Sequence, residues 1–299
     1  MAYSRLDAHP VGERSGGFEP ECSGGFCLNG SNKNPLSVVQ SFWMHRQLIV
    51  QLIKREIAGR YRGSFLGVVW SFINPLLMLS IYTFVFGVVF KSRWRSESAD
   101  PIEFAVVMFA GVMLHALIAE CINRAPSLIV SNVNFVKKVI FPLDALAWVA
   151  VGTALFHLMI ALLIFVAAIV VWQGAVPLTV LLVPVLIAPF ALMTVGFVWF
   201  VASLGVYLRD IGQLMGIVTS LLMFLAPVFY PLESVPASFR KYLYLNPITF
   251  VVEQVRNASV WGQPVDWAVW GIYCVIAYVI AWAGFAWFQR MRGGFADVL

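Results

Sequence analysis

The stretch KREIAGRYRGSFLGVVWSFINPLLML, residues 54–79, decides the fold class because its character changes abruptly in the middle. Its first nine residues hold four cations and one acid, and the apolar run that follows has no charged residue before Lys91. About 20 apolar residues in helical conformation span the hydrocarbon core of a bilayer. The junction therefore predicts a membrane-spanning helix with a basic anchor at one end.

The composition extends this prediction to the whole chain. Of the 299 residues, 61% are hydrophobic and only 12% are charged, whereas a soluble domain has about 25% charged residues. Several apolar runs reach spanning length, so we expect an all-α polytopic membrane protein. The net charge of +5 suits either anionic lipid headgroups or an acidic partner.

Six apolar runs are candidate spans, and both chain ends are expected in the cytoplasm. The runs are Leu66–Phe90, Phe104–Ile122, Leu143–Val171, Leu178–Leu208, Leu214–Tyr230 and Trp267–Phe288. In this orientation eleven cations flank the inner ends of the spans and six lie in outer loops, in line with the excess of Lys and Arg in cytoplasmic loops. The first outer loop, with three cations, is the local exception.

The chain before the spans divides into two parts. Residues 1–35 are rich in Gly, Ser, Asn and Pro and have no apolar period, which predicts a disordered cytoplasmic tail. Residues 36–62 show a helical pattern, with valine and isoleucine on one side and glutamine, lysine and arginine on the other. This pattern predicts an amphipathic helix lying flat in the membrane interface, apolar face down. Residues 63–299 then form the six-span domain.

Two loops are too long for plain turns. The inner loop, residues 123–142, has an apolar helical face beside two lysines, and it either lies on the membrane surface or docks on a cytoplasmic partner. The outer loop, residues 231–266, contains two potential half-helices around Asn246-Pro247, where proline suits the first helical position. It forms either a re-entrant hairpin, which must be buried in protein or line a wet cavity, or a pair of interfacial helices.

Ionisable residues inside the spans are few, which disfavours an ion-coupled carrier. His115 and His157 are interpreted as hydrogen-bonded packing residues, and Glu120 as a structural partner of Arg124 one turn later. The other carboxylates form no recognisable cluster, and no metal-ligand spacing or nucleophile motif appears. We therefore expect no catalytic residue and no metal on this chain.

Aromatic residues make up 15% of the chain. Interfacial belts and helix packing account for most of them. Those crowding the outer halves of the first and fifth spans are alternatively candidates for a channel lining, where ring faces stack weakly on the C–H faces of sugars. The candidates for this lining are Tyr82, Phe86, Phe224, Phe229 and Tyr230, together with Trp70 near the inner end of the first span.

Two segments, residues 54–90 and 226–258, resemble the membrane subunit of bacterial ABC polysaccharide exporters, and the resemblance runs from about Leu36 to the C-terminus. The first match is carried by Arg55-Glu56, Arg60-Tyr61-Arg62, Ser64, Leu66-Gly67, Trp70 and Asn74-Pro75. The second is carried by Pro231, Pro236, Arg240, Asn246-Pro247, Glu253 and Arg256. The fit looks closest to O-antigen exporters of the Wzm type and to the related teichoic-acid permeases.

The resemblance implies a homodimer of six-span subunits that encloses a channel and is driven by two separate ATPase subunits. ATP and Mg would bind to those subunits, so this chain is expected to carry no cofactor and not to be an enzyme. The resemblance assigns coupling to the ATPase to the inner loop, with Ser131, Asn134, Phe135, Lys137 and Lys138. It assigns the outer gate to Arg240, Tyr244, Asn246, Pro247, Glu253 and Arg256.

The expected function is export of a polysaccharide linked to undecaprenyl pyrophosphate, of the O-antigen type, from the cytoplasm across the bacterial inner membrane. The expected partners are the lipid-linked polysaccharide and membrane lipids, not nucleic acid. Arg55, Arg60 and Arg62 are candidates for binding the pyrophosphate by charge-assisted hydrogen bonds, and anchoring by the positive-inside rule is the alternative. A capsule or teichoic-acid permease is the alternative function, and an ion-coupled carrier the alternative from another class.

Overall fold

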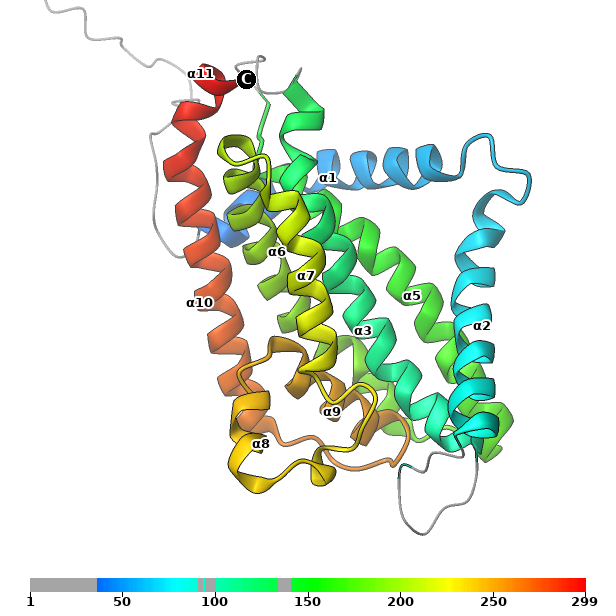
Figure 1. Ribbon diagram of the computed structural model, residues 1–299. Helices are drawn as coiled ribbons and strands as arrows, with labels where there is room; N and C mark the ends of the chain where they lie inside the picture. The colour runs from blue at the N-terminus through cyan, green and yellow to red at the C-terminus, as the bar shows by residue number, and fades with distance from the viewer. Residues whose placement is uncertain (1–36, 91–93, 95–100, 134–140) are drawn as a thin grey trace, which may run out of the picture. The chain divides into compact units, whose positions relative to one another are not determined.

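The computed structural model describes residues 37–90, 94, 101–133 and 141–299, and all regular elements in these ranges are helical (Figure 1). The α-helices are α1 Ser37–Tyr61, α2 Trp70–Tyr82, α3 Pro101–Leu128, α5 Ala145–Gln173, α6 Val183–Tyr207, α7 Ile211–Phe224, α8 Ala237–Leu243, α9 Pro247–Ser259, α10 Trp267–Met291 and α11 Phe295–Val298. Shorter 3-10 or π segments are η1 Gly67–Val69, η2 Thr83–Val89, η3 Val130–Asn132, η4 Leu178–Leu182, η5 Leu232–Ser234 and η6 Arg292–Gly294. The predicted all-α fold class is confirmed.

Five helical stretches in the described ranges are long and apolar enough to cross a membrane. They are Gly67–Val89, Ile102–Leu128, Ala145–Gln173, Leu178–Tyr207 and Trp267–Gly294. These stretches agree with five of the six predicted spans. The protein is therefore a multi-pass membrane protein.

The remaining predicted span, residues 214–230, differs from the structure. Its helix, α7, begins earlier, at Ile211, and has 14 residues, which gives a length of about 21 Å. A bilayer core is about 30 Å thick, so α7 is too short to cross it alone. The helix stops because Pro227 has no backbone N–H and disfavours helical conformation at the residue before it.

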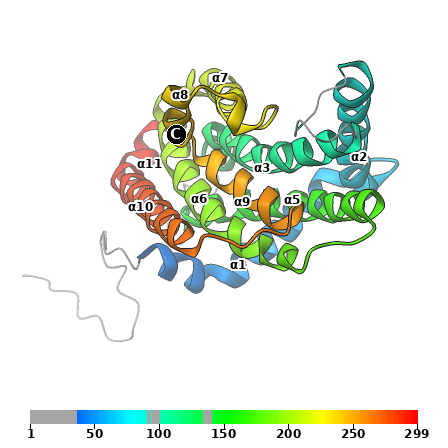
Figure 2. The same cartoon turned by 90° about the horizontal axis from the view of Figure 1, so that it is seen from below.

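Helices α3 and α6 lie in the middle of the bundle, whereas α2 and α10 lie on opposite sides of it (Figure 2). The most apolar window of the span that contains α3 is 78% buried, but that of the span formed by η1, α2 and η2 is only 6% buried. The α2 side therefore presents a large apolar surface to whatever surrounds the subunit.

Glycines allow α6 and α10 to pack closely. A Cβ atom added to Gly284 would lie 2.2 Å from the carbonyl oxygen of Gly196, and one added to Gly196 would lie 2.7 Å from the Cα of Ala281. Such contacts leave no room for any side chain at these positions. Small residues at a helix crossing are typical of membrane proteins, where close backbone approach supplies much of the packing.

Helix α1 runs across one end of the bundle, near the end where α11 lies, while α8 and α9 lie at the opposite end (Figure 1). The apolar side chains Ile49 and Leu52 pack against Ala145 and Val149 at the start of α5. Part of the predicted apolar face is thus covered by α5 rather than turned toward lipid. That α1 lies in the plane of the membrane stays a prediction.

Candidate functional site

A cluster of charged side chains joins α1, α3 and α5 at the α1 end of the bundle. Arg60 of α1 donates a hydrogen bond to Glu120 of α3. The Nδ1 atom of His157, on α5, lies 2.9 Å from the second oxygen of the same carboxylate. The hydroxyl of Tyr61 lies 3.1 Å from the Nε2 atom of His157. Three helices therefore meet on one carboxylate.

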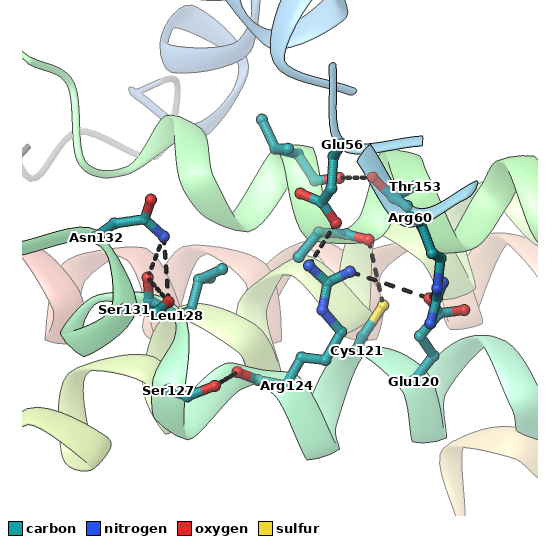
Figure 3. Close-up of polar contacts among 12 residues, drawn as sticks. Glu56, Arg60, Glu120, Cys121, Arg124, Ser127, Leu128, Ser131, Asn132 and Thr153 are labelled. Atoms are coloured by element: carbon teal, nitrogen blue, oxygen red, sulfur yellow. Dashed lines mark hydrogen bonds and ion pairs between the residues drawn. The ribbon is translucent and has the colours of Figure 1, made fainter. Parts of the chain in front are cut away.

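Arg124 continues this cluster along α3. Its guanidinium is paired with Glu56 of α1 and lies 4.0 Å from Glu120 (Figure 3). The predicted pairing of Glu120 with Arg124 is therefore present, but only as the longest contact of the group. The sequence pattern missed Arg60 and His157 as closer partners of Glu120, and it missed Glu56 as a closer partner of Arg124. We call Glu56, Arg60, Glu120, Arg124 and His157 the charge cluster.

Three members of the charge cluster, Arg60, Glu120 and His157, form one end of a cavity of about 400 Å³ between α2, α3 and α5. Its polar wall contains Arg60, Tyr61, Ser71, Asn74, Glu120 and His157. Its apolar wall contains Pro75, Met78, Phe109, Val112, Met113, Ala116, Leu117, Ala154, Leu158 and Ala161. The cavity thus joins a hydrocarbon-like lining to a charged end, which suits an amphiphilic ligand.

The three arginines predicted to bind a pyrophosphate are not equivalent in the structure. Arg60 takes part in the charge cluster, with 45% of its side chain exposed. Arg55 and Arg62 are exposed, and Arg55 borders a second, smaller cavity on the other side of Glu56. The structure therefore brings Arg60 alone of the three to the larger cavity, and the role of the group stays a prediction.

The second cavity, of about 250 Å³, lies between α1 and the beginning of the inner loop. Ser131 and Asn132 of η3 line it together with Arg124, and the side-chain amide of Asn132 donates to the carbonyl of Leu128 at 2.9 Å (Figure 3). The other residues predicted for ATPase coupling lie outside the described part of the chain. They are Asn134, Phe135, Lys137 and Lys138.

At the opposite end, the predicted break between two helices of the outer loop is confirmed. The side-chain oxygen of Asn246 accepts from the backbone N–H of Ile248 at 3.0 Å, and Pro247 is the first residue of α9. This geometry is an N-terminal cap, which satisfies a backbone donor that the helix leaves unpaired. The amide nitrogen of Asn246 also donates to the carbonyl of Leu222 at 2.8 Å, so the cap ties α9 to α7.

Arg256 of α9 is completely buried, with 0% exposure. It donates to the backbone carbonyls of Val107, at 2.8 Å, and Val228, at 3.0 Å, and also to that of Pro227. Its guanidinium carbon lies 4.4 Å from the ring centroid of Trp94, within the range of a cation–π interaction. This single side chain therefore links α9 with α3, with the turn after α7 and with the first outer loop.

Burial lowers the pKa of Arg256 to about 10, although the neighbouring Glu253 opposes that shift. Arg256 therefore remains charged at neutral pH. Burial also raises the pKa of Glu253, and Arg256, 3.3 Å away, partly offsets this. The cation is thus neutralised by one carboxylate and solvated by carbonyl oxygens.

The residues predicted for the outer gate do not form one site. Arg240 donates to the carbonyls of Glu233 and Val235, both at 3.0 Å, within its own loop, and Tyr244 is 54% exposed. Asn246 and Arg256, by contrast, are buried. Helix α8 is therefore exposed and locally organised, whereas α9 is part of the core.

The predicted channel aromatics, except Trp70, come together in one row. Ring centroids lie 6.5 Å apart for Tyr82 and Phe86, 6.1 Å for Phe86 and Phe229, and 5.9 Å for Phe229 and Phe224. The hydroxyl of Tyr230 donates to the Phe224 carbonyl at 3.0 Å. The row thus connects η2 with α7, although these segments are far apart in the sequence.

Trp70 begins α2, whereas Tyr82 ends it, so the two are separated by about 18 Å along the helix. Trp70 therefore lies away from the row. Phe104 of α3, which was not among the candidates, stacks on Phe86 at 5.5 Å. Whether the row faces a channel stays a prediction.

The long apolar helices, with polar groups gathered at the two ends of the bundle, define a multi-pass membrane protein with the architecture of a permease. Within this class, residues 47–260 match the ABC-2 type transporter membrane family. The chain belongs to this family.

Individual relatives support the assignment over nearly the whole chain. An O-antigen export system permease protein RfbA from Myxococcus xanthus is 25% identical over 264 residues, covering 88% of this chain and 99% of the relative. An RfbA protein from Klebsiella pneumoniae is 21% identical over 253 residues, covering 84% and 95%. A polysialic acid transport protein KpsM from Escherichia coli is 23% identical over 227 residues, covering 74% and 84%.

Proposed function

We propose that this chain is the channel-forming permease subunit of an ATP-driven exporter of polysaccharide, of the O-antigen type. The observation that carries the proposal is the row of aromatic rings from Tyr82 to Phe224, which lies on the least buried span and on α7. Ring faces offer weak, repeated stacking sites along which a long glycan can slide. The relatives named for O-antigen export cover the chain almost completely, which supports the same substrate class.

A second copy of the chain completes the channel in this proposal. Most apolar side chains of α2 and several of α7 are exposed in the single subunit, among them Leu77, Ile81, Ile217 and Phe224. Two copies meeting along these helices would enclose the two aromatic rows. The proposed assembly is therefore a homodimer.

ATP hydrolysis, with its Mg, is assigned to two separate ATPase subunits. The inner loop from Ser131 would contact the ATPase subunits. Ser131 and Asn132 line one cavity with Arg124, and Arg124 pairs with Glu56 of α1, so a movement of the ATPase subunits would be transmitted to α1. In this arrangement the α1 end faces the cytoplasm, the α8 and α9 end faces the periplasm, and the membrane is the bacterial inner membrane. The cargo arrives linked to a polyprenyl pyrophosphate, for which Arg55, Arg60 and Arg62 are the candidate ligands.

Deletion of the gene in its own host tests the proposed function. We expect a surface polysaccharide to be lost and its lipid-linked precursor to accumulate inside the cell, with both effects reversed by the intact gene. The double variant Tyr82→Ala and Phe229→Ala should restore less than a tenth of the export while reaching normal abundance in the membrane. Unchanged surface polysaccharide after deletion would refute the proposal.

The same experiment separates the alternative cargos. The alternative of a capsule permease is supported by the relatives named for capsule and polysialic acid export. In that case the lost polymer is capsular and the lipopolysaccharide remains complete. Loss of a polymer rich in polyol phosphate would indicate a teichoic-acid permease. An ion-coupled carrier is not proposed, because the chain belongs to the ABC-2 type transporter family.

A further inference from the structure

We infer that the cavity between α2, α3 and α5 binds the phosphate group and adjoining hydrocarbon of a lipid, and that the Glu120 carboxylate competes with this phosphate for Arg60. The inference rests on the proposed function only for the placement of the α1 end at the cytoplasmic membrane surface. It does not depend on which polymer is exported. Its grounds are the lining of the cavity and the pairing within the charge cluster.

The cavity has a charged end and an apolar remainder, as a lipid has a charged phosphate and a hydrocarbon chain. Arg60, Tyr61 and His157 stand at one end, and methionine, valine, leucine and phenylalanine side chains line the rest. A volume of about 400 Å³ lies in the range of small-molecule sites and is too small for a polysaccharide. The ligand that fits is therefore a lipid headgroup with the first part of one chain.

Two further polar residues of α2, Ser71 and Asn74, line the same cavity. Asn74 is exposed on its wall although it lies within a membrane-spanning stretch. Pro75, the next residue, has no N–H to donate to the carbonyl of Ser71 one turn earlier, so that acceptor loses its usual helical partner. The wall thus offers the side-chain amide of Asn74 to hydroxyls next to the phosphate.

Glu120 holds Arg60 with the chemistry that a phosphate would use. Both are anions that accept charge-assisted hydrogen bonds from a guanidinium. Releasing Arg60 leaves the carboxylate paired, because His157 is 2.9 Å and Arg124 4.0 Å from its oxygens. The Glu120 carboxylate therefore keeps the cation of Arg124 beside it after the exchange, and the 45% exposure of the Arg60 side chain gives Arg60 room to reorient.

The test measures lipid binding to the full chain in nanodiscs of neutral lipid. The probes are undecaprenyl phosphate, phosphatidylglycerol and undecaprenol, which lacks a phosphate, and native mass spectrometry reports their affinities. Arg60→Gln should weaken phosphate binding about tenfold, the loss of roughly one charge-assisted hydrogen bond. Glu120→Gln should strengthen it by a similar factor, because the competitor has lost its charge.

Matched variants keep the result interpretable. Arg46→Gln removes an exposed arginine of α1 that lies outside the cavity. It should leave the affinities for undecaprenyl phosphate and phosphatidylglycerol unchanged. Ala116→Phe fills the apolar wall and should abolish binding of both phosphate lipids. If Glu120→Gln fails to fold, Glu120→Asp shortens the side chain, keeps the charge and should still strengthen binding.

Each outcome decides the question. Binding of both phosphate lipids supports a general lipid-phosphate site, and binding of undecaprenyl phosphate alone supports an isoprenoid source. Affinities equal to that of undecaprenol would overturn the inference, as would a folded Glu120 variant with unchanged affinity. These measurements involve no transport, so the two proposals can fail separately. Export that depends on the gene, without lipid binding to the cavity, would refute this inference alone. Lipid binding without any effect of gene deletion on export would refute the proposed function alone.

Discussion

Arg60 and Arg256 stand at opposite ends of the bundle and are held in opposite ways. Arg60 pairs with the side chain of Glu120 at the edge of a cavity and is 45% exposed on its side chain. Arg256 is fully buried and donates to backbone carbonyls, those of Val107 and Val228 among them. The backbone carbonyls around Arg256 are fixed in a packed core, whereas the side-chain carboxylate of Glu120 can exchange one hydrogen-bond donor for another. The comparison separates an arginine that fixes the fold from one that is available to a ligand.

The largest expected effect is on stability at Arg256. Arg256→Ala leaves the buried carbonyls of Pro227 and Val228 without the guanidinium donor and leaves Glu253 without its cation, and such losses cost about 3–5 kcal/mol. Arg60→Ala, at a half-exposed ion pair, should cost at most about 1 kcal/mol. Thermal unfolding of the two purified variants measures the difference. Equal losses for both would mean that Arg60 is as structural as Arg256.

A smaller effect is expected where α3 accommodates the guanidinium of Arg256. A Cβ atom on Gly111 would lie 2.9 Å from Nη2 of Arg256 and 3.2 Å from the Cα of Val228. Gly111→Val should therefore destabilise the protein by about 1–3 kcal/mol through overpacking. Gly216→Val is the control, because a Cβ there meets no atom within 4 Å. Similar melting temperatures for both variants would contradict the close approach.

The smallest expected effect concerns pH at the Arg256 end. Burial raises the pKa of Glu253, so the folded protein retains this proton at a pH where the unfolded chain has released it. The stabilisation of the folded protein by protonated Glu253 is complete below the ordinary pKa of a glutamate. It is lost as pH rises through the raised pKa of Glu253 in the folded protein. Melting temperature should thus fall over this window in the wild type. Glu253→Gln should flatten that fall, and an unchanged slope would show that another group titrates.

The sequence predicts the parts of the fold that depend on local chemistry. Uninterrupted apolar runs predict five of the spans, and Asn246-Pro247 predicts the cap and start of α9 because both signals act within a few residues. The end of α7 was harder to predict. The apolar run continues past Pro227, and hydropathy alone does not distinguish helix from turn.

The contacts of the site depend on distant segments and were not predictable in this way. Glu120 and His157 are 37 residues apart, and Arg256 and Val107 are 149 residues apart. Neither periodicity nor charge spacing tells which helix faces will meet. The resemblance assigns Arg256 to the outer gate, and only the three-dimensional packing reveals that carbonyl oxygens surround it.

The shortness of α7 also constrains what can lie beside it. After Phe224 the chain continues to Tyr230 without a regular helix, and two carbonyls of this turn, those of Pro227 and Val228, depend on Arg256 for their hydrogen bonds. Hydrocarbon cannot solvate irregular backbone, which survives at membrane depth only against protein or water. Ala226, Pro227 and Val228 are buried, so the chain itself encloses this turn. Arg256 thereby makes an irregular backbone segment compatible with a neighbouring acyl chain.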